Sequence, residues 1–186
     1  MPSLLRLTYA SRARFDDVNG SAGIHPEVAR ILIQSRRNNP RHGLVGALYF
    51  GDGCFFQCLE GPAAEVEALY QRLHDDPRHH DLKVLARDVV QRPSFSGWSM
   101  KLVPNASEVR RLMARHGRAT FDPYSFDAAL LAQTTRLLLE GPDAKLAAEV
   151  VTPPPGAPEP ALGLRYAMAV LGVVLLGVVA TVAVAR

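Results

Sequence analysis

The chain has 186 residues, of which 21% are charged, and a formal net charge of +3. This length allows one domain with a substantial core plus appendages, and a charge this small and dispersed argues against a dedicated nucleic-acid-binding protein. The two cysteines, Cys54 and Cys58, are expected to lie at opposite or offset positions of one strand. Since that spacing is poor for a disulfide and zinc ligands are missing, we predict reduced thiols in a reducing compartment.

The N-terminal segment predicts a strand, a loop and a helix. Residues 4–10 alternate between apolar and polar side chains, with Tyr9 at the end of the apolar face. Residues 11–23 are polar and contain glycine, which favours a loop. A helix is expected to open at His25-Pro26, because proline suits the first helical position, and to end at Asn38-Asn39-Pro40, because the residue before a proline disfavours helix.

A hairpin is predicted next. Two apolar runs, residues 44–50 and 54–59, flank the turn sequence Gly51-Asp52-Gly53. Alternation places Gln57 between two apolar side chains on the face that we expect to be buried. A buried amide without a partner costs about 1–3 kcal/mol, so something polar must meet it. A nearby backbone group or water would satisfy an isolated glutamine, and a bound ligand is the alternative.

The remaining predicted elements are a helix starting at Gly61-Pro62, a connection over residues 75–81, a strand over 82–90 and a final strand over 97–103. His79 lies in the connection, and Trp98 and Met100 share a face of the final strand. This order, βαββαββ, predicts an α+β protein of ferredoxin-like fold. It would have a mixed sheet, the first strand central, and two helices packed on one face.

The C-terminal part predicts further helices and a membrane segment. We expect a short amphipathic helix over residues 106–116, a longer one from Asp122-Pro123 to Glu140, and a last short one over 143–150. A proline-rich linker follows. Residues 166–185 carry no charge, and about 20 apolar residues span a hydrocarbon core of about 30 Å, so one transmembrane helix is predicted.

No enzyme motif is apparent: GxSxG, Walker, HExxH and GxGxxG patterns are missing, and the histidines show no metal-ligand spacing. The chain offers instead polar or redox-capable residues at the ends of apolar faces. These are Tyr9, Asn39, Gln57, Trp98 and Met100, and the predicted sheet would let them converge between sheet and helices. Singly, each also has an ordinary structural explanation as a core residue or helix terminator.

Together, at these spacings, the residues resemble the BLUF domain, a small flavin-binding blue-light sensor. The resemblance covers Leu4 to about Val103 and is carried by LLRLTYAS, SRRNNPRHGLVGALYF, GCFFQCLEGP, DPRHHDLKVL and RPSFSGWSMKL. It implies that Tyr9, Asn39, Gln57 and Met100 occupy flavin-site positions, that Trp98 matches the family's tryptophan, and that His79 lies near the flavin.

The resemblance also implies non-covalent FAD, although no motif separates FAD from FMN. The phosphates of the cofactor could be held by Arg36, Arg37, Arg41 or His79, and the sequence does not decide among them. Arg36, Arg37 and Arg41 also suit a solvated helix end.

The implied function is that of a photoreceptor rather than an enzyme. Light would drive electron and proton transfer from Tyr9, and rearrangement of the Gln57 amide would switch the hydrogen bonds of the flavin. The signal would pass through the last strand to the helices after Val103. Output would then need an unidentified signalling protein, or homo-oligomer contacts through the C-terminal helices.

Two alternatives stay open. One is a light-insensitive, membrane-tethered flavin or regulatory module, against which the intact Tyr9–Gln57 pair argues. The other is an acylphosphatase-like hydrolase, for which the Arg–Asn phosphate loop is missing.

We therefore divide the chain into four parts. Residues 1–103 form the expected BLUF flavin-binding domain, 104–150 a helical extension, 151–163 the linker and 164–186 a single-pass tail anchor. The missing signal peptide and the reduced thiols favour a cytoplasmic sensory domain. The resemblance suggests a bacterial inner membrane.

Overall fold

The computed structural model describes residues 4–15, 24–95, 99–103 and 106–140. Its elements are β1 (Leu4–Ala13), α1 (Pro26–Asn38), η1 (Asn39–His42), β2 (Val45–Gly51), β3 (Cys54–Pro62), α2 (Ala63–Leu73), β4 (His79–Val90), β5 (Lys101–Leu102), α3 (Ala106–Arg115), η2 (Pro123–Ser125) and α4 (Ala128–Glu140). In the part of the chain that the structure describes, none of the helices has the length and apolar character needed to span a membrane. The predicted helix over 143–150, the linker and the anchor over 164–186 lie outside the described residues.

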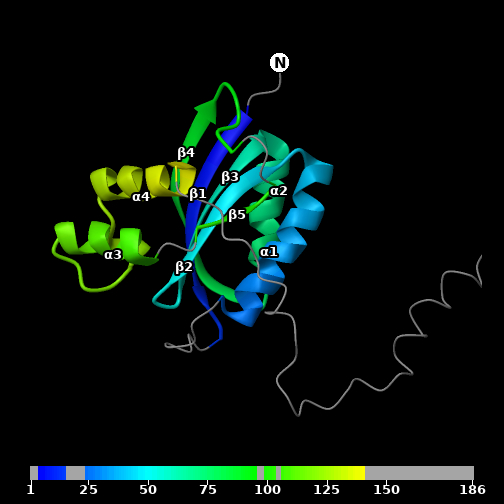
Figure 1. Ribbon diagram of the computed structural model, residues 1–186. Coiled ribbons are helices and arrows are strands. Elements are labelled where there is room, and N and C mark those ends of the chain that lie inside the picture. Colours follow the sequence, from blue (N-terminus) through cyan, green and yellow to red (C-terminus); the bar gives the residue numbers. More distant parts are fainter. Residues whose placement is uncertain (1–3, 16–23, 96–98, 104–105, 141–186) are drawn as a thin grey trace, which may run out of the picture. The chain divides into compact units, whose positions relative to one another are not determined.

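The five strands form one mixed sheet in the order β4-β1-β3-β2-β5. Strand β1 is antiparallel to β3 and β4, β2 is antiparallel to β3, and β2 and β5 are parallel. Helices α1 and α2 cover one face, whereas α3 and α4 lie on the other (Figure 1). The predicted ferredoxin-like fold is confirmed. Strand β1 is internal as expected, but β3 is the middle strand because the hairpin places it between β1 and β2.

The β2–β3 hairpin is confirmed at the predicted turn. Asp52 and Gly53 both have positive φ, 49° and 70°. Two consecutive residues of this conformation produce the turn whose twist matches that of the flanking strands, and Asp-Gly is a favoured sequence for it. The turn therefore sets the register in which β3 faces both of its neighbours.

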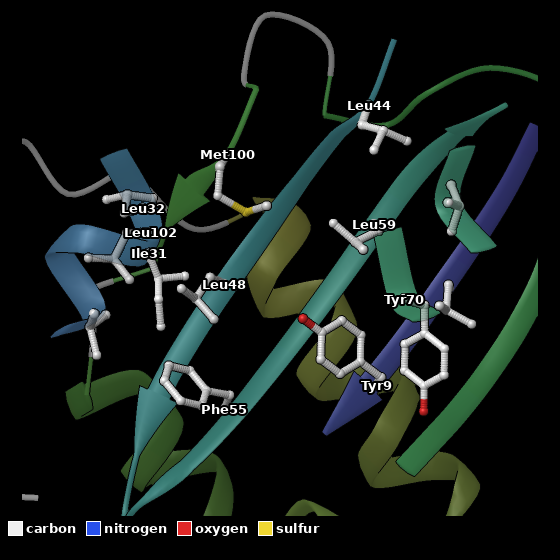
Figure 2. Packing of buried hydrophobic residues seen from close by; sticks show 13 residues of the cluster. Tyr9, Ile31, Leu32, Leu44, Leu48, Phe55, Leu59, Tyr70, Met100 and Leu102 are labelled. Carbon is white, nitrogen blue, oxygen red and sulfur yellow. The ribbon is translucent and has the colours of Figure 1, made fainter. Parts of the chain in front are cut away.

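Two hydrophobic cores lie on opposite faces of the sheet. The first, between the sheet and α1/α2, contains Leu7, Tyr9, Val28, Ile31, Leu32, Leu44, Leu48, Phe55, Leu59, Val66, Tyr70, Met100 and Leu102. Figure 2 shows Tyr9, Leu48, Phe55, Leu59 and Met100 gathered over the strands on this side. The second, under α3 and α4, contains Ala47, Tyr49, Cys54, Phe56, Cys58, Phe95, Val103, Val109, Leu112, Met113, Phe121, Leu130 and Leu138.

Several predicted boundaries were wrong. The loop expected from residue 11 begins later, and β4 begins at His79, because Arg12 and Ala13 pair with His80 and His79 and so extend both strands. Of the predicted final strand, residues 97 and 98 lie outside the described residues, and among residues 99–103 only Lys101–Leu102 form a strand, β5.

The helix expected from Asp122 begins at Ala128 instead. The Asp122 carboxylate accepts the Tyr124 N–H at 3.3 Å and thereby caps the short η2. The Asp127 carboxylate accepts the Leu130 N–H at 2.8 Å and caps α4 in its place.

The expected placement of the two cysteines was also wrong. Cys54 and Cys58 lie on the same face of β3, as alternation requires of residues four apart, and both are buried free thiols.

Candidate functional site

A cavity of about 750 Å³ lies among α1, η1, α2 and the start of β4. Apolar side chains from the two helices line it, among them Ile31, Leu69 and Leu73. Most of the other lining residues are polar or charged, and they include the amides Asn39 and Gln57. A cavity of this size is typical of small-molecule and cofactor sites, and its polar side chains can bind the hydrogen-bonding or charged groups of a ligand.

A buried hydrogen-bond chain runs from β1 through Gln57 to the last strand. The Tyr9 hydroxyl donates to Gln57 Oε1 at 2.5 Å, and Gln57 Nε2 donates to Met100 Sδ at 3.7 Å. Tyr9 and Gln57 are direct cross-strand partners in the β1–β3 ladder, so their side chains emerge on one face at the same height. The structure therefore brings together three of the six site residues predicted from sequence.

Tyr9, the first donor of this hydrogen-bond chain, is fully buried. Burial, with a smaller contribution from Tyr70, strongly raises the pKa of the Tyr9 phenol. The phenol therefore stays protonated at physiological pH and acts as the hydrogen-bond donor to Gln57. Its ring packs edge-on against Tyr70, with 5.4 Å between ring centroids, which holds the hydroxyl in place.

Asn39 closes α1 and faces the cavity. Its backbone N–H bonds to Ser35 O, and its side-chain Nδ2 donates to Ser99 O at 2.8 Å. Next to it, Arg36 Nε donates to Met100 O at 2.8 Å. The end of α1 therefore holds the segment that leads into β5. Sequence reasoning missed this role of Arg36, because no local spacing relates residues 64 positions apart.

His79 lines the cavity from the first position of β4 rather than from a connection. Its Nδ1 lies 2.8 Å from Ser11 Oγ. Burial lowers the pKa of His79 to about 4, so the imidazole is neutral at physiological pH. Trp98, also predicted for the site, lies outside the described residues.

An ion pair that sequence reasoning missed lies at the edge of the cavity. Arg78 donates to both carboxylate oxygens of Asp76, at 2.9 and 2.6 Å, and Arg78 Nη2 also donates to Gln34 Oε1 at 2.9 Å. These hydrogen bonds from Arg78 lower the pKa of Asp76. The pair links the start of β4 to α1. The Asp-Pro-Arg sequence was the available signal, because Asp76 Oδ1 also accepts the Arg78 N–H in a local turn.

The arrangement suits a flat heteroaromatic ligand with hydrogen-bonding edges. Two buried amides, Asn39 and Gln57, each offer donors and an acceptor, and Gln57 already contacts an oxidisable phenol. Among the described residues, no group of three His, Cys, Asp or Glu side chains is arranged to hold a metal ion. The two amides suit hydrogen bonding to a ligand, and the buried phenol of Tyr9 suits electron or proton transfer.

Comparison with known proteins agrees with this geometry. The family described as sensors of blue light using FAD, BLUF, matches residues 4–101. The blue light- and temperature-regulated antirepressor BluF of Escherichia coli strain K12 is 29% identical over 99 residues, which cover 53% of this chain and 23% of that protein. The beta subunit of the photoactivated adenylate cyclase of Euglena gracilis is 32% identical over 75 residues, covering 40% of this chain and 9% of that protein. The chain thus spans less than a quarter of the length of these curated relatives.

Solved structures share the fold over most of the described chain. The photo-activated state of BlsA superimposes with a TM-score of 0.67 and 31% identity, covering 77% of this chain and 99% of that one. The dark state of BlrB, a BLUF protein, gives a TM-score of 0.60 and 26% identity, covering 75% and 97%. With the family match over residues 4–101 and a flavin-sized cavity beside the buried Tyr9–Gln57 pair, the chain belongs to the BLUF family of blue-light flavin sensors.

Proposed function

We propose that the chain is a blue-light photoreceptor that binds FAD non-covalently in the cavity between α1 and α2 and turns over no substrate. The observation that carries the proposal is the buried Tyr9–Gln57–Met100 chain, whose central amide opens onto the cavity. The choice of FAD over FMN is supported by the description of the family.

The residues present fit a flavin. The apolar side chains of the two helices suit the faces of an isoalloxazine ring, and the Asn39 and Gln57 amides suit its edge, which carries both acceptors and an N–H donor. Once bound, a flavin would supply blue-light absorption and, when excited, an acceptor for one electron. Asn39 and Gln57 would orient it, and apolar side chains such as Ile31 and Leu69 would pack against its ring.

Tyr9 and Gln57 would act as the switch. In the structure, Tyr9 donates to Gln57 Oε1 while Gln57 Nε2 points to Met100 Sδ. In the light, Tyr9 would give an electron and its phenolic proton to the bound flavin, and it would take both back in the dark. Rotation or tautomerisation of the Gln57 amide meanwhile exchanges donor for acceptor on each side. This exchange alters the partner of Met100 and so changes the environment of β5.

The signal passes from β5 to α3 and α4 and from there to an unidentified partner protein or to a second copy of the chain. The charge-free sequence from residue 166 to 185 anchors the protein by a single C-terminal helix, with the sensory domain in the cytoplasm of a bacterium.

The test is an absorption spectrum of the full chain purified with FAD, recorded before and after blue light. We expect flavin bands that move reversibly to longer wavelength and recover in the dark. A protein that cannot be loaded with FAD, or whose flavin absorption bands do not move in the light, would contradict the photoreceptor proposal. Loading with FMN in parallel decides which flavin is bound.

A further inference from the structure

Lys101 of β5 carries an ammonium group that is almost entirely buried. Only 5% of the residue is exposed, and Nζ donates to Leu138 O at 3.1 Å and to Leu139 O at 3.2 Å. Burying an ammonium is costly unless hydrogen-bond acceptors replace the lost water. The two carbonyls at the end of α4 are therefore partners on which the position of Lys101 depends.

The structure describes α4 as far as Glu140, and Pro142, four residues after Leu138, has no N–H with which to bond the Leu138 carbonyl. The last carbonyls of a helix have no intrahelical donor and carry partial negative charge, which a nearby cation stabilises. The last turn of α4 contains no basic residue, and Arg136, one turn earlier, pairs with Glu140 at 2.8 Å. Lys101 therefore supplies from another element the cap that the sequence of α4 lacks.

The same short strand also reaches the candidate flavin site. Met100, directly before Lys101, packs in the core under α1 and α2 and accepts the hydrogen bond of Gln57, whereas Lys101 points to the opposite face. Strand β5 pairs with β2 at only two positions, Ala47 with Lys101 and Leu48 with Leu102. With so few ladder pairs, the position of β5 depends largely on the side-chain contacts made to Ser99, Met100 and Lys101.

The other end of the α3–α4 unit is held differently. The Phe121 N–H donates to Asp52 Oδ2 at 2.6 Å, and the Tyr124 hydroxyl donates to Asp81 O at 2.7 Å. The Arg12 guanidinium also lies 4.8 Å from the centre of the Tyr124 ring. These contacts fix the connection before α4 to the hairpin turn and to β4, which is the edge strand opposite β5. A shift of β5 would therefore change the contacts of the last described turn of α4, while the connection before α4 stays in place.

We propose that Lys101 is a light-sensitive latch, a positioning residue that couples the state of Gln57 to the last turn of α4. In the dark its ammonium caps Leu138 and Leu139. When the Gln57 amide changes its hydrogen bond to Met100, β5 shifts, the ammonium leaves these carbonyls and the last turn frays. This inference rests on the proposed photoreceptor function. It names the contact through which a change at Gln57 would reach α4.

The experiment is hydrogen exchange of the FAD-loaded full chain, in the dark and under continuous blue light, with the absorption spectrum of the same samples. We expect exchange in the last turn of α4 to rise about tenfold in the light, the scale of one lost charge-assisted hydrogen bond. Lys101→Met keeps the aliphatic stem without the ammonium. It should exchange fast in both conditions and still show the shift of the flavin bands.

Two further variants complete the design. Lys101→Arg keeps a cation and should restore a difference between light and dark. Lys83→Met is the matched control, because Lys83 Nζ also donates to a backbone carbonyl of the C-terminal unit, that of Tyr124 at 3.4 Å, but from the exposed surface of β4. It should keep the full light–dark difference of the parent.

The outcomes separate the two proposals. A parent whose flavin bands shift while exchange in α4 stays constant overturns the latch and leaves the photoreceptor standing, even if Lys101→Met does not fold. A Lys101→Met protein that keeps the parent's light–dark difference also overturns the latch. A parent whose flavin bands do not move overturns the photoreceptor proposal and the latch with it.

Discussion

The two faces of the sheet differ in how closely their side chains are packed. The face under α1 and α2 keeps a cavity of about 750 Å³ with a buried amide at its edge. The face under α3 and α4 is packed with aromatic rings, for example Tyr49 and Phe56 against Phe121, with centroids 4.7 and 6.1 Å apart. The first face leaves room for a ligand, and the second packs the strands closely against two helices.

Strand β3 joins the two faces. Its alternating residues send Gln57 to the cavity and Phe56 and Cys58 to the aromatic side. Glu60, on the aromatic side, is fully buried and bonded to Arg6 Nε at 2.6 Å and to the Ser94 N–H. Polar groups are therefore buried on both faces. On the cavity side Gln57 can exchange its hydrogen-bond partners, whereas on the aromatic side Glu60 is held in an ion pair with Arg6.

The largest effect is expected at the phenol of the cavity face. Tyr9→Phe removes the hydroxyl but keeps the buried ring, so FAD should bind while the light-induced shift of its bands is abolished. Stability should fall by about 1 kcal/mol, because Gln57 Oε1 loses its donor. Tyr70→Phe, on the ring that packs against Tyr9, is the control and should keep the shift. A light response that survives in Tyr9→Phe would remove Tyr9 from the mechanism.

The cavity face should also set the acid sensitivity of the fold. With a pKa near 4 in the folded protein and about 6.5 when unfolded, His79 binds fewer protons in the native state between these values. The stability that His79 contributes is therefore present above about pH 6.5 and is lost as the pH falls toward 4, by about 3 kcal/mol in total.

Urea unfolding across this pH range measures the effect. His79→Asn can still face Ser11 Oγ and should flatten the pH dependence, with His80→Asn at the next position as the control. An unchanged slope in His79→Asn would mean that His79 does not carry the acid sensitivity.

A smaller effect is expected on the aromatic face. Glu60→Gln weakens the buried pair with Arg6 and should cost about 2 kcal/mol in the free energy of unfolding. The flavin bands should still shift, because Glu60 faces away from the cavity. Glu67→Gln, which breaks an exposed pair with Arg87, should cost well under about 1 kcal/mol. Loss of the light response in Glu60→Gln, in a folded and FAD-loaded protein, would contradict the separation of the two faces.

Local rules predicted the parts of this architecture that depend on neighbouring residues. The Asp52-Gly53 turn set the hairpin, and alternation along β3 placed Gln57 on the buried face. The same alternation should have put Cys54 and Cys58 on one face, so that error was avoidable.

Long-range contacts could not be predicted in this way. The bonds of Arg36 to Met100, Asn39 to Ser99 and Lys101 to Leu138 join residues 64, 60 and 37 positions apart. They depend on how elements meet in three dimensions, and no spacing in the sequence encodes them. The extension of β4 to His79 was missed for a related reason, since it follows from pairing with β1.

The most direct test of the account is the light-minus-dark absorption spectrum of Gln57→Leu beside Gln34→Leu. Both replace a glutamine that lines the cavity, but only Gln57 touches Tyr9 and Met100. We predict that both variants bind FAD, that Gln34→Leu keeps the reversible shift to longer wavelength, and that Gln57→Leu loses it. A shift of parental size in FAD-loaded Gln57→Leu would contradict the claim that this amide is the switch.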